Sequence, residues 1–142
     1  MVEISLRKAR TIIRKTIEKG RELELKPLSV VVLDSGGNVK AFERQDGAAP
    51  GRFAIAHGKA FGAVMLGMSG SAMKARAEEQ AYFMQAVNGV YGGKVIPVPG
   101  GILIMDKRDR VIGAIGVTGD TSENDVVAGL AGIEHAGLTG QS

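Results

Sequence analysis

The sequence predicts an α/β protein of the α+β type, in which helices pack on an antiparallel sheet. Two pairs of strand-like segments, each joined by a short turn, indicate two β-hairpins, and helix-like segments lie before, between and after them. Strands that follow one another without a crossover helix pair antiparallel. Because 142 residues is the usual size of one domain, we expect a single domain over residues 1–142.

The first helix and the first hairpin are predicted within residues 1–44. The hairpin has β-branched residues at 28–34, a Gly-Gly turn, and alternating apolar and polar residues at 39–44. Gly20 is expected to stop the preceding helix. The apolar face of that helix recurs at helical spacing, at Val2, Leu6, Ala9, Ile13 and Ile17.

Two helices are predicted in the middle of the chain. Pro50 precedes a segment at about 51–67 that is apolar nearly all round, so we expect a buried helix there. Ser71 is expected to cap a further helix that ends near Gly89.

The second hairpin is predicted at residues 101–106 and 110–119. The preceding loop, residues 91–101, has room only for a short edge strand, because its prolines lack a backbone N–H group. Ser122 is expected to cap the last helix, with acidic residues in its first turn.

The composition excludes several classes of protein. The chain is 44% hydrophobic and 23% charged, which is typical of a globular domain, and it contains no cysteine for disulfides, zinc–thiolate sites or thiol nucleophiles. No apolar stretch is long enough to span a bilayer and the first residues do not form a signal peptide, so we expect a cytoplasmic protein without a membrane partner. The net charge is +3, but glutamates interrupt the basic residues near the start, which favours a solvated helix face over a nucleic-acid interface.

His57 and Lys59 interrupt the apolar helix at 51–67. Two residues correspond to about 200° around a helix, so the two side chains face opposite sides and do not form one catalytic pair. Burying either group costs free energy unless it has a partner, which makes both candidates for a site. His57 is a candidate ligand or acid–base group. Lys59 either belongs to a site or forms an ion pair with Asp34 or Asp46.

Three charged residues lie at the ends of the first two strands. Asp34 is expected to cap the turn, while a role in lining a pocket stays open. Arg44 and Asp46 can hold a polar ligand or transfer a proton, or they can brace the loop as an Arg–Asp link. We expect Asp46 and Lys59 to act in a ligand site.

The glycine-rich segments do not match a known phosphate loop. Neither 97–101 nor 113–119 has the spacing of the dinucleotide fingerprint or of the Walker motif. Gly119 precedes the start of the last helix, whose free amides can bind an anion. His135 near the end of that helix is interpreted as structural. Without an HExxH motif or a cluster of histidines and carboxylates, no dedicated catalytic metal site is expected.

Four segments together resemble the GlcG/HbpS-like family: LSVVVLDSGGNVKAFERQDGA, AHGKA, PVPGG and VIGAIGVTGDTSENDVVAGLAG. That family includes the haem-binding HbpS proteins, the GlcG proteins of glycolate operons and the C-terminal domain of PduO-type proteins. The resemblance extends over about residues 4–138. It implies a profilin-like fold, with a five-stranded antiparallel sheet in the order 2-1-5-4-3 and helices on both faces.

The resemblance implies a small-molecule-binding protein, with haem or a related tetrapyrrole as the first ligand to test. We expect a site between the first hairpin, the helix at 51–67 and the loop after Val117. His57 is the expected ligand of iron, and Arg44 or Lys59 the expected partner of the propionates. Family members tend to form oligomers, and the small residues on the predicted helices also predict a homo-oligomer.

Two other functions stay open. One is a cofactor-independent isomerase, hydratase, lyase or hydrolase that moves a proton on a small catabolic metabolite. Its acid, base and anion clamp would come from Asp34, Asp46, His57 and Lys59. The other is an accessory subunit of a catabolic enzyme.

Overall fold

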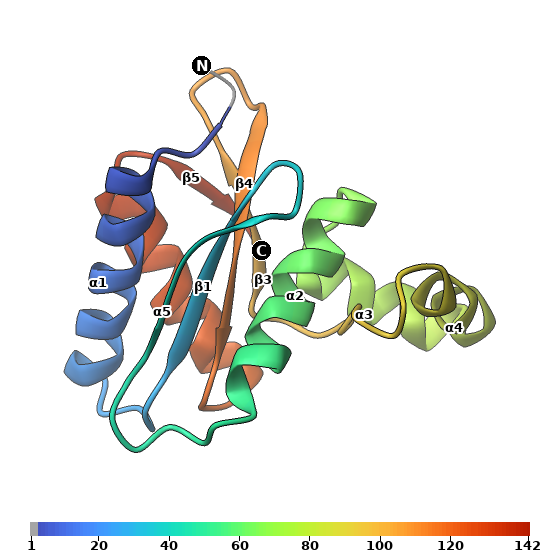
Figure 1. Ribbon diagram of the computed structural model, residues 1–142, viewed down its shortest axis with the longest axis horizontal. Coiled ribbons are helices and arrows are strands. Elements are labelled where there is room, and N and C mark those ends of the chain that lie inside the picture. Colours follow the sequence, from blue (N-terminus) through green and yellow to red (C-terminus); the bar gives the residue numbers. More distant parts are fainter. Residues whose placement is uncertain (1–2) are drawn as a thin grey trace.

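The computed structural model describes residues 3–142 and contains one antiparallel sheet of five strands (Figure 1). The α/β class and both predicted hairpins are confirmed, in a profilin-like arrangement. Along the sheet the order is β2-β1-β4-β3-β5. The strands are β1 (Ser29–Asp34), β2 (Val39–Arg44), β3 (Gly101–Met105), β4 (Val111–Thr118) and β5 (Thr139–Gln141).

The edge strand beside β3 comes from a different part of the chain than expected. The expected order counted a short strand within residues 91–101, whereas the structure places β5 at that edge, with Leu103 opposite Gln141. Pro97 and Pro99 lack the N–H groups that a strand needs to pair. The order of the four hairpin strands is as predicted.

Helices cover both faces of the sheet. On one face lie α1 (Leu6–Glu22) and α5 (Ser122–His135), and on the other lies α2 (Arg52–Leu66), followed by α3 (Gly70–Glu79) and α4 (Ala81–Val90) (Figure 1). Each face has its own apolar core. The short aliphatic residues of β1 and β4 alternate between the two cores, which is how a sheet buried on both sides is built.

Several predicted helix ends were wrong. The residues that cap the starts of α3 and α5 are Ser69 and Thr121, not Ser71 and Ser122, because their side chains accept the hydrogen bonds from the first turn. Gly20 does not end α1, which continues to Glu22, and instead a Cβ at Gly20 would lie 2.8 Å from Cδ1 of Leu28. The helix predicted to run to Gly89 is two helices, because Gln80 leaves the helical conformation with φ −137°. Val2, expected on the apolar face of the first helix, lies outside the described residues.

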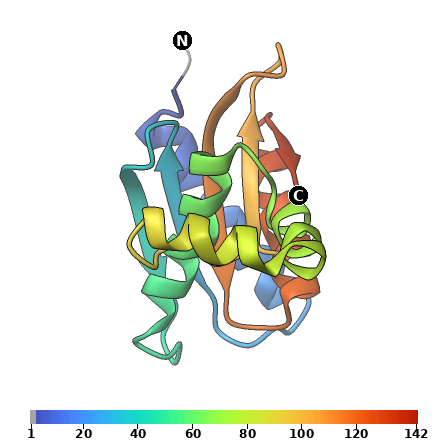
Figure 2. The same cartoon turned by 90° about the vertical axis from the view of Figure 1, so that its right-hand side faces the viewer.

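The α3–α4 pair projects away from the sheet. In Figure 1, α4 lies at the opposite end of the molecule from α1, and Figure 2 shows it crossing in front of α2. Several large apolar side chains of α4 are exposed, including Tyr82 at 70% and Val90 at 77%. Among the helices of residues 3–142, none is long and apolar enough to cross a membrane.

Candidate functional site

A depression of about 460 Å³ lies beside α2 and is mostly apolar. One wall is α2, and another is the segment that follows α4, residues 93–96. This segment takes the place of the loop after Val117, which was expected to bound the site. The lining residues are Val39, Phe53, Ala54, Ile55, His57, Gly93, Lys94 and Ile96.

An aromatic column runs along this side of α2. Phe53, His57 and Phe61 are spaced four residues apart and therefore lie on one face of the helix. The imidazole of His57 stacks on the Phe61 ring at a centroid distance of 5.4 Å and lies 5.8 Å from the Phe53 ring. Phe42 packs edge-on against Phe53, and Tyr91 edge-on against Phe61. Such a surface favours a flat, apolar ligand.

His57 is held in its neutral form by its surroundings. Partial burial lowers the pKa of the imidazole below its ordinary value of 6.5, and the positive charge of Lys94 lowers the pKa further. At neutral pH the ring therefore has a free nitrogen lone pair, which is the form that binds a metal or accepts a proton.

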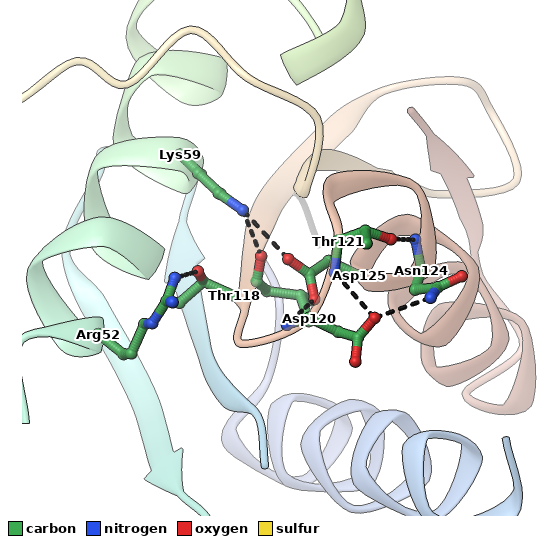
Figure 3. A network of polar contacts seen from close by, with 8 residues as sticks. Arg52, Lys59, Thr118, Asp120, Thr121, Asn124 and Asp125 are labelled. Atoms are coloured by element: carbon green, nitrogen blue, oxygen red, sulfur yellow. Dashed lines mark hydrogen bonds and ion pairs between the residues drawn. The ribbon is translucent and has the colours of Figure 1, made fainter. Parts of the chain in front are cut away.

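Lys59 points the other way, toward the sheet, as the spacing predicts. Its side chain is 4% exposed, and Nζ donates a hydrogen bond to the Val117 carbonyl at 2.9 Å and lies 3.4 Å from Oδ2 of Asp125 (Figure 3). The other carboxylate oxygen of Asp125 accepts a hydrogen bond from the Asp120 amide at 3.0 Å. The ion pair thus ties α2 to the end of β4 and the start of α5.

The partner expected for Lys59 was wrong. Asp34 instead caps its own turn, where Oδ1 accepts hydrogen bonds from the amides of Gly36 and Asn38. Asp46 is exposed on another part of the surface. The periodicity placed Lys59 on the sheet side, but its acidic partner comes from α5, 66 residues later in the chain.

Arg44 and Asp46 lie in a separate, polar depression beside α1. That depression shares no lining residue with the one beside His57. The guanidinium of Arg44 donates a hydrogen bond to the Ala48 carbonyl at 2.9 Å, so it braces the loop after β2. Between residues 3 and 142, no ion pair joins Arg44 to Asp46.

The start of α5 near Gly119 is occupied by its own side chains. The amide of Asp120 donates to Asp125, that of Thr121 to the Asp120 carboxylate, and that of Asn124 to the Thr121 hydroxyl (Figure 3). Hydrogen bonds to the Asp120 carboxylate from the Asn124 side chain, the Lys26 amide and the Thr121 amide lower the pKa of Asp120 to about 2. Two carboxylates at this terminus disfavour a bound anion.

The four residues considered for proton transfer do not form one group. In the part of the chain that the structure describes, no hydrogen bond or ion pair connects any two of Asp34, Asp46, His57 and Lys59. Nor do any three histidine or acidic side chains of residues 3–142 cluster closely enough to hold a metal ion.

The residues that surround His57 were not predicted from the sequence. The aromatic column has a signal that could have been found, because Phe53, His57 and Phe61 follow the helical repeat. The position of Lys94 beside His57 could not have been predicted from a local pattern, since it depends on how the segment after α4 returns to α2.

Comparisons with known proteins agree with this fold. The model of a family described as "Haem degrading protein HbpS-like" matches residues 4–134. Among curated proteins, none matches the chain.

Three solved structures are similar over nearly the whole chain. PduOC, solved as a heme complex, is 20% identical to this chain with a TM-score of 0.86, and the match covers 99% of this chain and 100% of PduOC. At this identity the likeness supports the fold alone. The protein ORFY of Klebsiella pneumoniae is 26% identical with a TM-score of 0.83, covering 96% and 93% of the two chains. A double mutant of Streptomyces reticuli HbpS is 26% identical with a TM-score of 0.79, covering 95% and 88%.

Proposed function

Because the chain belongs to the HbpS-like family, we propose that it binds haem or a related tetrapyrrole in the depression beside α2, with His57 as the ligand of iron. The observation that carries the proposal is the imidazole of His57, which lines an apolar depression and packs between the rings of Phe53 and Phe61. The family description and the likeness to HbpS support haem as the first ligand to test.

The residues present fit this group chemically. A porphyrin is flat and apolar and packs favourably against aromatic and aliphatic side chains, which Phe53, Ile55 and Ile96 provide beside His57. A neutral imidazole is a common ligand of haem iron. When bound, haem would supply an iron centre whose reactivity depends on its axial ligand and on the polarity of the pocket.

We expect hemin titrated into the protein to give a saturable, red-shifted Soret band. Replacing His57 by alanine removes the proposed iron ligand, so the affinity for hemin should fall by roughly tenfold or more, equivalent to about 1.4 kcal/mol or more. The matched control is His135→Ala, because His135 is exposed at the end of α5 and lines no part of this depression. Equal losses in the two variants, or a spectrum that does not change on titration, would contradict the proposal.

We also propose that the protein is a homo-oligomer that associates through α4. Tyr82, Phe83 and Val90 expose large apolar surfaces on this helix, and such surfaces favour association because burial removes them from water. Light scattering at micromolar concentration should give a mass well above the 14.8 kDa of one chain. The double variant Tyr82→Glu/Val90→Glu should lower that mass. A monomeric wild-type protein would refute the proposal.

A further inference from the structure

The depression beside His57 is lined by one cationic side chain and by no acidic side chain. Lys94 is the only lysine, arginine or carboxylate among its lining residues. Its ammonium lies 5.8 Å from the centre of the Phe61 ring, within the range of a cation–π contact. No ion pair or hydrogen bond of this ammonium is found among residues 3–142. A ligand that enters the depression therefore meets aromatic rings and an unneutralised positive charge.

The backbone of Lys94 is fixed where it faces the depression. Its amide donates a hydrogen bond to the Tyr91 carbonyl at 3.3 Å, and the next amide, of Val95, donates to the side chain of Asn88 at 2.9 Å. The amide of Ile96 donates to the Gly58 carbonyl of α2 at 3.2 Å. These bonds hold the segment against α2.

Gly58 allows this close approach. A Cβ at Gly58 would lie 2.5 Å from the Lys94 carbonyl oxygen, which is far inside van der Waals contact. The position of Lys94 relative to His57 is thus determined by packing and hydrogen bonding, and only the end of its side chain is free to follow a ligand.

We propose that Lys94 is the anion-recognition residue of this depression, so that the ligand is a planar aromatic molecule with a carboxylate at its edge. The inference rests on the same depression as the proposed haem site and gives the propionates a partner other than Arg44 or Lys59. Arg44 lines another depression, and Lys59 is already paired with Asp125. An ammonium–carboxylate pair is stronger beside apolar rings than in open water, because less solvent screens it.

The test compares acids with their esters, since an ester keeps the ring and loses the charge. Hemin and hemin dimethyl ester are titrated by absorbance, and 1-pyrenebutyric acid and its methyl ester by fluorescence anisotropy. Each is measured against the wild type, Lys94→Gln, Lys94→Arg and a matched control, Lys107→Gln. Lys107 is exposed in the turn between β3 and β4, away from the lining residues.

We expect Lys94→Gln to weaken the binding of both acids by roughly twofold to fivefold. The esters should bind the wild type and Lys94→Gln equally, Lys94→Arg should retain most of the affinity for the acids, and Lys107→Gln should have no effect. Unchanged affinity of Lys94→Gln for the acids, or equal losses for acids and esters, would overturn the inference.

The two proposals can fail separately. If hemin binds through His57 but Lys94→Gln has no effect, the haem proposal stands and the role of Lys94 is refuted. If hemin gives no Soret change that depends on His57, while pyrenebutyrate binds more weakly to Lys94→Gln than to the wild type, the anion-recognition role stands and the haem proposal is refuted. If neither acid binds the wild type, both are refuted.

Discussion

Replacing Lys59 by methionine is expected to lower the free energy of unfolding by about 3–5 kcal/mol, the range measured when one partner of a buried ion pair is removed. Methionine fills a similar volume, so the cost arises mainly from the carboxylate that stays behind. Asp125 is 1% exposed and, among residues 3–142, forms an ion pair with Lys59 alone, so without Lys59 its charge would have no ion-pair partner and little access to water.

The pKa values of the pair indicate what drives this cost. Burial lowers the pKa of Lys59 and raises the pKa of Asp125, and in both residues burial is the largest cause while the attraction between the two charges opposes it. The hydrogen bond from the Asp120 amide also favours the charged form of Asp125, so Lys59 depends on its partner for its charge, and Asp125 depends on both Lys59 and Asp120. Removing both charges should cost less than removing one.

The double variant Lys59→Met/Asp125→Asn tests this explanation. Asparagine keeps an oxygen that can accept the hydrogen bond from the Asp120 amide, but carries no charge. We expect the double variant to be more stable than Lys59→Met alone by at least about 1 kcal/mol. Chemical denaturation measures both free energies, and Lys74→Met, at an exposed position of α3, is the control.

Chemical denaturation combined with hemin titration of the Lys59→Met variant distinguishes a structural role of Lys59 from a role in ligand binding. A Lys59→Met variant that unfolds like the wild type but no longer binds hemin would place Lys59 in the ligand site. A destabilised variant that still binds hemin when folded would show that Lys59 joins α2, β4 and α5.

Local sequence patterns were sufficient to predict most of the elements. The first hairpin follows from two runs of strand-forming residues around Gly36 and Gly37, because these interactions lie within 16 residues of the chain. The opposite orientations of His57 and Lys59 follow from the geometry of one helix. Each of these predictions needs only neighbouring residues.

Features that depend on distant segments could not be predicted in the same way. Lys59 finds Asp125 only after α5 has packed beside β4, and β5 reaches the edge of the sheet from the end of the chain. Lys94 faces His57 because the segment after α4 returns to α2 and bonds to Gly58. In all three cases the deciding contact joins residues far apart in the sequence.

Replacing Gly116 by alanine is expected to have the second large effect on stability, because α2 lies directly on β4 at this position. A Cβ at Gly116 would lie 1.9 Å from the Ala56 carbonyl oxygen and 3.2 Å from the Ala60 side chain. The oxygen belongs to the backbone of α2, so the clash cannot be relieved by a change of rotamer. The Gly116→Ala variant must move the helix away from the sheet, and we expect it to lose about 3 kcal/mol, at the upper end of the range for overpacked cores.

Because the clash is with a backbone atom, two further variants serve as controls for this prediction. Shortening the neighbouring side chain in Gly116→Ala/Ala60→Gly should not restore stability, since the Ala56 carbonyl stays in place. Gly89→Ala should be neutral or stabilise the protein by up to about 1 kcal/mol, because a Cβ there meets nothing within 4 Å and alanine favours the helix. A shift of α2 away from the sheet also moves His57 and Phe53 relative to Val39 of β2, which lines the same depression, so folded Gly116→Ala should bind hemin more weakly than the wild type. A Gly116→Ala protein with wild-type unfolding and wild-type hemin affinity would show that α2 does not pack on β4 as closely as described.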